Sequence, residues 1–211
     1  MAVGDVTQTI LDDLKTMIED SDEEDFDVDA PLLSFIKYAQ LDVATLLDIR
    51  CLTEFETMVQ YSLASGSGIL LSNITGGASI LKGAAGINYI SVDGVYAERI
   101  TDLRVLTMGD FYAGTEDIPK YWIWSNKLYF QVGTSWATKA IDFYYLKVPP
   151  DPYLTLDEGV TPSVDVLLNV SYHGILLDFA ASKAFRARDN VRSEKHLNEG
   201  LAKIELANKS I

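Results

Sequence analysis

Residues 121–150 read YWIWSNKLYFQVGTSWATKAIDFYYLKVPP, and this stretch decides the predicted fold. Two segments rich in aromatic and β-branched residues flank a short polar tip, which is the pattern of a β-hairpin. The tip consists of Ser125, Asn126 and Lys127. Counted two residues at a time, one face of this hairpin holds Trp122, Trp124, Leu128, Phe130 and Val132. The other face holds Tyr121, Ile123, Tyr129 and Gln131.

A third apolar run, AIDFYYLKV at residues 140–148, follows the hairpin and stops at Pro149-Pro150. Proline has no backbone N–H to donate to a ladder, so the strand should end there. We therefore predict a three-stranded antiparallel meander over these residues. Asp93-Gly94, flanked by alternating apolar residues, predicts a second hairpin upstream of it.

Helical sequence lies on both sides of this β-rich stretch. Residues 6–18 place apolar side chains on one stripe, and a second helix should start near Ala30 or Pro31. We expect that second helix to offer for burial Leu33, Ile36, Tyr38, Leu41, Leu46 and Leu47. A long helix from residue 164 to residue 187 is apolar on most faces, which predicts deep packing. After a break at Asp189-Asn190, we expect a final helix over 191–209 that buries Leu197, Leu201, Ile204 and Leu206.

The predicted fold class is therefore α+β. A bundle of about four helices, two N-terminal and two C-terminal, carries an inserted antiparallel β-rich domain. The expected divisions are residues 1–54 for the N-terminal helices, 55–158 for the β-rich insertion and 159–211 for the C-terminal helices.

The composition limits the possible classes of function. One cysteine, Cys51, excludes an intrachain disulfide. No apolar run approaches the roughly 20 residues that cross a bilayer, and no basic-then-apolar leader opens the sequence. We expect a protein made in a reducing cytoplasm, without a membrane segment.

The net charge of −14 is unevenly distributed. Residues 1–30 carry eleven acidic side chains against Lys15 alone, whereas the sequence from Lys183 onward is locally basic. Such an acidic chain should not hold DNA by neutralising phosphates. It could line a passage through which DNA slides, since like charges repel.

Catalytic and metal-binding patterns are weak. Asp25, Asp27 and Asp29 alternate as calcium ligands do, but an EF-hand loop needs glycine and glutamate where this chain has Ala30 and Ile36. A solvated loop, or an acidic docking segment, is the simpler interpretation. We predict no metal and no cofactor.

The two histidines are also better explained without chemistry. His173 lies within an apolar helix, where a hydrogen-bonded core histidine is expected, and His196 should lie at the surface. Neither is paired by motif with Cys51 or with a serine. The glycine turns match no phosphate-binding loop, and no two carboxylates are placed in one cleft. We predict that the protein is not an enzyme.

Three tryptophans, Trp122, Trp124 and Trp136, leave a carbohydrate-binding module as an alternative. Aromatic side chains on a hairpin more often pack across strands or anchor an interface.

Taken together, the layout resembles the head-to-tail adaptor (connector) proteins of tailed bacteriophages. The hairpin Tyr121-Trp122-Ile123-Trp124 with Leu128-Tyr129-Phe130 resembles that family's hairpin. The strand Ile141-Asp142-Phe143-Tyr144-Tyr145 before Pro149-Pro150, and the closing helix with Phe179-Ala180-Ala181-Ser182-Lys183-Ala184, continue the resemblance. The acidic run at 20–29 and the glycine-rich residues 64–86 are not part of the family pattern.

The resemblance implies a structural virion protein at the head–tail junction. Such adaptors form a ring, usually of twelve copies, beneath the portal protein and extend the DNA channel. They offer a docking surface to a tail nozzle or tail-tube protein, and genomic DNA passes through without specific binding. A different tail or baseplate component remains an alternative.

The resemblance also assigns candidate contacts. The portal-contact candidates are Arg188, Arg192, Lys195, Lys203, Lys209 and Ile211. The tail-contact candidates, from the hairpin tip and the loop at 109–119, are Tyr112, Lys120, Ser125, Asn126 and Lys127.

Overall fold

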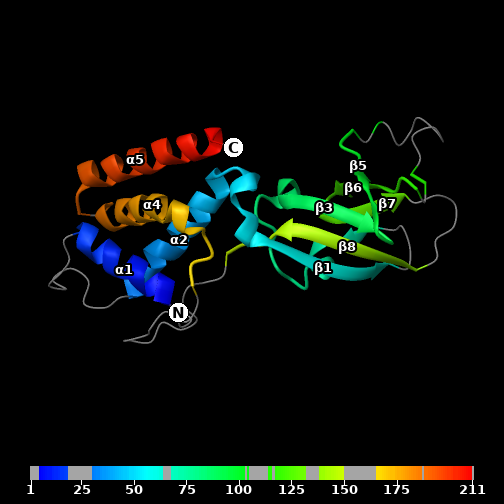
Figure 1. Ribbon diagram of the computed structural model, residues 1–211, viewed down its shortest axis with the longest axis horizontal. Coiled ribbons are helices and arrows are strands. Elements are labelled where there is room, and N and C mark those ends of the chain that lie inside the picture. Colours follow the sequence, from blue (N-terminus) through cyan, green and yellow to red (C-terminus); the bar gives the residue numbers. More distant parts are fainter. Residues whose placement is uncertain are drawn as a thin grey trace. The chain divides into compact units, whose positions relative to one another are not determined.

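The computed structural model describes residues 5–18, 30–63, 68–102, 104, 114–115, 117–131, 138–149, 165–186 and 188–210. It divides the chain into two compact units (Figure 1). Met1–Phe55 and Pro149–Ile211 form one unit, and Glu56–Val148 forms the other. The structure is thus a mixed α+β fold with five helices and two sheets among the described residues, in agreement with the predicted class.

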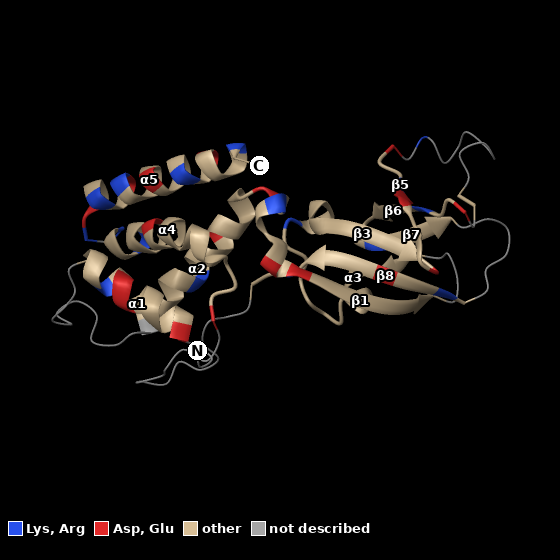
Figure 2. Ribbon diagram, in the orientation of Figure 1, with Lys and Arg blue, Asp and Glu red and all other residues tan. Residues whose placement is uncertain are grey.

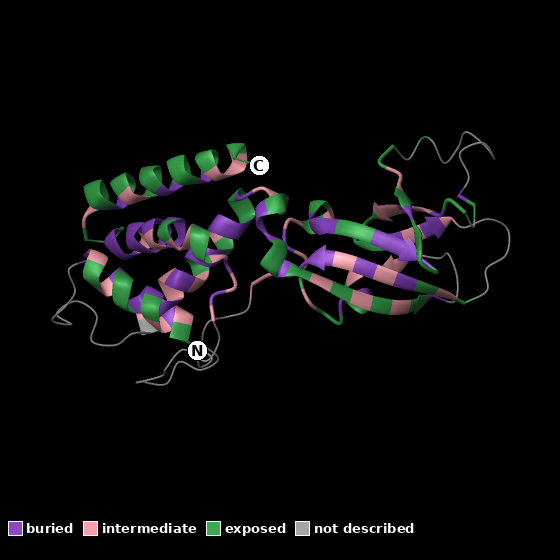
Figure 3. Ribbon diagram, in the orientation of Figure 1, coloured by how far each residue is buried: buried purple, intermediate pink, exposed green. Residues whose placement is uncertain are grey.

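The first unit is helical. Its long helices are α1 (Asp5–Ile18), α2 (Ala30–Leu46), α4 (His173–Phe185) and α5 (Asn190–Lys209). Helix α4 contacts each of the other three. It buries nine of its 13 residues (Figure 3), which confirms the deep packing expected from its apolar sequence. Ala180, Ala181 and Ala184 are among the nine, and their short side chains allow neighbouring helices to approach closely.

The long C-terminal helix was expected from residue 164, and this start is wrong among the described residues. Residues 165–169 are not helical, Val170–Tyr172 form a 3-10 turn, and α4 begins at His173. The backbone N–H of Val166 donates to Thr7 Oγ1 of α1 at 2.9 Å. The N–H of Leu167 donates to Gln40 Oε1 of α2 at 2.7 Å. Side chains of two other helices therefore replace the helical ladder of this segment, which periodicity cannot reveal.

The buried side of α5 also differs from the expected one. Ile204 is buried as expected, but Leu197, Leu201 and Leu206 are exposed. The buried positions of the helix are Ser193, Gly200 and Ile204. Gly200 is central because a Cβ placed there would lie 2.7 Å from a ring carbon of Phe179 on α4. The absence of a side chain at Gly200, rather than a stripe of leucines, decides which face of α5 packs on α4.

The second unit consists of two four-stranded sheets. The first has the order β1 (Glu56–Leu63), β8 (Lys139–Leu146), β3 (Ile87–Val92) and β4 (Val95–Tyr96). The second has the order β2 (Ile69–Leu70), β7 (Lys127–Gln131), β6 (Lys120–Trp124) and β5 (Glu98–Arg99). All pairs are antiparallel except β5 with β6, and the short helix α3 (Leu71–Ile74) follows β2. Both sheets contribute to one core, with Ile90 and Phe143 from the first and Leu128 and Phe130 from the second.

The predicted three-stranded meander is wrong. Strands β6 and β7 form the predicted hairpin, but β8 pairs with β1 and β3 of the other sheet. Residues 140–146 have the expected extended conformation, so the error lies in the partner and not in the element. Local sequence predicts a strand, whereas pairing with β1, more than 70 residues earlier in the chain, depends on the tertiary fold.

Both predicted hairpin turns are confirmed as two-residue turns. Asp93 and Gly94 join β3 to β4, and Ser125 and Asn126 join β6 to β7. All four residues have positive φ, between 49° and 80°, as a type I′ turn requires. Asp93 is also held by Lys139, whose ammonium lies 2.9 Å from its carboxylate and lowers the pKa of Asp93.

The two-residue turn corrects the predicted faces of the central hairpin. Tyr121 lies opposite Phe130, and Trp122 lies opposite Tyr129. Residues that are directly opposite share a face, so Tyr121, Ile123, Leu128 and Phe130 form the inner side. Counting every second residue through the tip places Leu128 and Phe130 on the same face as the tryptophans. Across a two-residue turn, the residues that share a face are offset from this count by one, so the predicted faces of the second strand are exchanged. Val132 lies outside the described residues.

The close approach at Gly200 gives a test of the helical unit. Replacing Gly200 by alanine favours an isolated helix by about 1 kcal/mol, but here the new methyl group meets Phe179. We expect Gly200→Ala to lower the free energy of unfolding by about 1–3 kcal/mol, as overpacking does. Chemical denaturation measures the change. Asn198→Ala, at an exposed position of the same helix, is the control and should not destabilise; equal behaviour of the two variants would contradict the predicted contact.

Candidate functional site

Helix α5 carries most of the residues predicted to contact the portal. The N-terminus of α5 is formed by Asp189, whose carboxylate accepts hydrogen bonds from the N–H groups of Val191 and Arg192 at 3.0 Å. This cap confirms the predicted break at Asp189-Asn190. Lysines and arginines recur along the helix with acids between them (Figure 2).

The portal-contact candidates have different surroundings. Arg188 lies between α4 and α5 and is exposed. Arg192 and Lys195 line one pocket in the first two turns of α5. Lys203 turns toward α4, and Lys209 pairs with Glu205 at the C-terminal end of α5. Ile211 lies outside the described residues.

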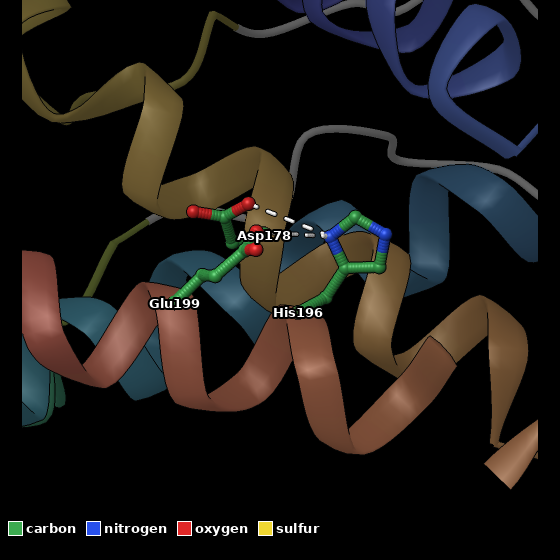
Figure 4. A group of neighbouring side chains, drawn as sticks. All are labelled: Asp178, His196 and Glu199. Carbon is green, nitrogen blue, oxygen red and sulfur yellow. Dashed lines mark ion pairs between the residues drawn. The ribbon is translucent and has the colours of Figure 1, made fainter. Parts of the chain in front are cut away.

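An ionic cluster joins α5 to α4 (Figure 4). Asp178 is the only acidic residue of α4, and its side chain is 3% exposed. Lys203 Nζ lies 2.5 Å from Asp178 Oδ2. His196 Nδ1 lies 3.6 Å from Asp178 Oδ1 and 3.9 Å from Glu199 Oε2. A buried carboxylate is costly without a compensating charge, and both groups that face it come from α5.

The same cluster offers the donor types that a divalent metal ion uses. Ligand atoms of Asp178, His196 and Glu199 lie within 4.8 Å of one another. However, the Lys203 ammonium already neutralises Asp178 and would repel a cation at that oxygen. We therefore interpret the cluster as an interhelical ionic network. His196 is only 14% exposed, so the predicted surface placement of this residue is wrong.

The other groups considered for chemistry have structural surroundings. His173 Nε2 bonds to the carbonyl oxygen of Leu168 at 2.9 Å, as expected of a satisfied histidine. Cys51 is buried, and its hydrogen bond to Tyr172, with partial burial of the phenol, raises the pKa of Tyr172 to about 12. Residues 19–29, which include the acidic run considered for calcium, lie outside the described residues.

The tail-contact candidates lie in the β unit. Ser125 and Asn126 form the exposed turn between β6 and β7, and Lys127 is the exposed first residue of β7. Lys120 is at the opposite end of β6, where its ammonium lies 3.8 Å from Glu98 and its side chain is mostly covered. Tyr112 lies outside the described residues.

The tryptophans considered for carbohydrate binding do not form a described platform. Trp122 stacks on Tyr129 across the strands, with ring centroids 5.5 Å apart and planes inclined by 6°. This is the cross-strand packing expected of hairpin aromatics. Trp124 is exposed beside the turn, and Trp136 lies outside the described residues.

Comparison with known protein families decides the class. Residues 1–209 match the family described as SU10 adaptor protein. The chain belongs to the SU10 adaptor protein family. No curated protein matches the sequence. Family membership confirms the resemblance to phage head-to-tail adaptors and makes this chain a structural adaptor of the bacteriophage virion.

Membership of an adaptor family implies interaction with portal and tail proteins in general, and it favours a structural rather than an enzymatic role. None of the helices that the structure describes is long and apolar enough to cross a membrane.

Sequence reasoning missed Asp178 in this SU10 adaptor, although a signal for it was present. A single acid in an otherwise apolar helix must find a partner if the helix is buried. His196 and Lys203 lie seven residues apart on α5, which places them on one side of that helix. The pairing itself depends on how α4 and α5 pack.

The ionic cluster predicts an asymmetric response to charge removal. Lys203→Met leaves the Asp178 carboxylate buried with a weaker partner, and we expect a loss of about 2 kcal/mol in unfolding free energy. This is less than for a fully buried pair, because Lys203 is half exposed. Denaturant unfolding provides the measurement. Replacing both partners, as in Asp178→Leu with Lys203→Met, should recover most of the loss.

Lys209→Met is the matched control, because Lys209 pairs with Glu205 at the surface of the same helix. It should change the stability by no more than about 0.5 kcal/mol. If Lys203→Met cost no more than this control, Asp178 would not depend on Lys203.

Proposed function

We propose that this SU10 adaptor forms a ring beneath the portal, joins head to tail and extends the DNA channel. The family match over residues 1–209 carries the proposal. The two structural units support separate roles for two parts of the chain. One is a body of about four helices, formed by residues 1–54 and 159–211, and the other is the β-rich insertion of residues 55–158. We propose twelve copies in the ring, as is usual among such adaptors.

Exposed apolar side chains on α2 support lateral contacts between copies. Tyr38 and Leu41 were expected to be buried, but they are 53% and 37% exposed. They are three residues apart and therefore lie on one face of α2. Leu46 and Ile49 near the C-terminal end of α2 are also exposed. Apolar side chains gathered on one helix face are typical of a protein–protein contact.

The charge of the chain supports a channel that does not bind DNA. At a net charge of −14, repulsion from phosphates opposes adhesion of a moving duplex. Basic side chains instead recur on α5, where Arg192, Lys195, Lys203 and Lys209 are our candidates for the portal contact. Arg188, just before this helix, and Ile211 complete the set of candidates.

A ring at one vertex of the head is the expected outcome of the principal test. Purified chain is cosedimented with tail-less, DNA-filled heads of its own phage, and the particles are imaged. Tyr38→Glu with Leu41→Glu should abolish ring density, because charges would be buried between copies. Ser72→Glu with Asn73→Glu adds the same charge at exposed positions of α3, outside both proposed contact helices, and serves as the control.

Two outcomes would contradict the proposal. The chain could remain monomeric in every assembled particle, or its density could lie away from the portal vertex. The second outcome would favour the alternative of another tail or baseplate component.

The exposed turn between β6 and β7 provides a separate prediction for the tail side. Lys127→Glu should reduce tail attachment to adaptor-bearing heads about tenfold, since reversing a rim charge slows association with a complementary partner. It should leave binding to heads unchanged. Lys147→Glu, an exposed lysine of the same unit, is the control. Equal tail attachment by the two variants would argue against a tail contact at this turn.

A further inference from the structure

The helical unit contains a small pocket where the ends of three helices meet. Its volume is about 310 Å³. It is lined by Met17 near the end of α1, Phe185 at the end of α4, and Arg192, Lys195 and His196 in the first half of α5. Three of the five lining side chains are basic, in a chain whose net charge is strongly negative. A concave site with clustered basic groups indicates an acidic ligand.

Phe185 organises the basic groups of this pocket. The His196 ring lies parallel to the Phe185 ring, with centroids 5.6 Å apart and planes inclined by 7°. The Arg192 guanidinium lies 5.4 Å from the centroid of the same ring. An arginine that is stacked on an aromatic ring has fewer conformations to lose when it binds a carboxylate. The pocket therefore combines a buried aromatic ring with a cation that this ring positions.

Two acids pair with the cations of the pocket from outside its lining. Asp189 lies 3.5 Å from Arg192 Nε and also caps α5, while Glu199 lies 4.0 Å from Lys195 Nζ. Neither acid lines the pocket. The Nδ1 edge of His196 faces Asp178 and Glu199, and the second ring nitrogen points away from these carboxylates (Figure 4). Lys195 has a 67% exposed side chain and can reach an incoming group.

We propose that this pocket receives an aspartate or glutamate side chain of the portal protein, with an apolar neighbour of that residue on Met17. The inference rests on the function proposed above and gives the portal contact a chemical class. It selects Arg192 and Lys195 among the portal-contact candidates, because these two share the pocket. A bidentate contact from the guanidinium and a flexible ammonium suit one carboxylate.

A DNA phosphate fits the pocket less well. Binding to a duplex depends on several phosphates at once, met by cations spread over an open surface. Here the cations converge on a small pocket that Met17 and Phe185 also line, and acids follow on the same helix. A single acidic side chain with an apolar neighbour matches this arrangement in size and charge.

The first arm of the test uses a defined peptide. The full chain, labelled with ¹⁵N, is titrated with acetyl-Phe-Glu-Leu-Glu-amide and with its glutamine counterpart, acetyl-Phe-Gln-Leu-Gln-amide. We expect saturable shifts at the backbone amides of the five lining residues with the acidic peptide only. Arg192→Gln with Lys195→Gln should weaken binding about tenfold, because each partly exposed charge pair contributes roughly fivefold or less. Lys209→Gln, at the other end of α5, should bind as the unaltered chain does.

Equal binding of the two peptides, or shifts outside the pocket, would overturn the inference. So would equal peptide affinities of the double variant and the Lys209→Gln control. Loss of binding to a duplex of 20 base pairs in the same double variant would identify the ligand as nucleic acid and would also overturn it.

The second arm uses tail-less heads and separates this inference from the proposed function. If the double variant binds heads about tenfold more weakly than Lys147→Gln, which alters an exposed lysine of the other unit, the portal uses the pocket. If all three chains bind heads equally, the pocket inference is wrong and the adaptor function stands. If the unaltered chain binds no heads, the proposed function fails, and with it the portal as the source of the acidic side chain.

Discussion

The burial of α4 is the constraint on which the helical unit depends. A helix that buries nine of 13 residues needs cover on several sides, and α1, α2 and α5 provide it. Gly200 allows α5 to approach Phe179, and Lys203 with His196 meets the one acid that α4 buries. Packing on α4 therefore occupies the inner side of α5. Most other positions of α5 are exposed.

The β unit depends on a different constraint, which is that its two small sheets share one core. Strand β8 lies between β1 and β3, and the β6–β7 hairpin belongs to the opposite sheet. Side chains from both sheets meet in the same buried cluster. The turn at Ser125-Asn126 is thereby carried on a hairpin whose inner face is anchored by Tyr121, Leu128 and Phe130. An exposed turn on an anchored hairpin is a suitable contact point for a tail protein.

The proposed adaptor role requires binding to protein neighbours without retention of the DNA in the proposed channel. The chain is strongly acidic as a whole, yet Arg192 and Lys195 line one pocket. A negative net charge, with two cations brought together in one pocket, would meet both requirements. An acidic side chain on a protein can enter such a pocket, whereas repulsion from the rest of the molecule opposes a duplex.

The sequence by itself determined the α+β class, the cap of α5 and both hairpin turns. These features depend on neighbouring residues: Asp189 caps the helix that follows it, and Asp93-Gly94 and Ser125-Asn126 can adopt positive φ. Only the tertiary structure decided that β8 joins β1 and β3, that α4 begins at His173, and that His196 faces Asp178. Each of these depends on groups far apart in the chain, such as Thr7 with Val166 or Lys203 with Asp178. Local periodicity records which residues are apolar, but the choice among distant partners is made by close packing and by the need to compensate buried polar groups.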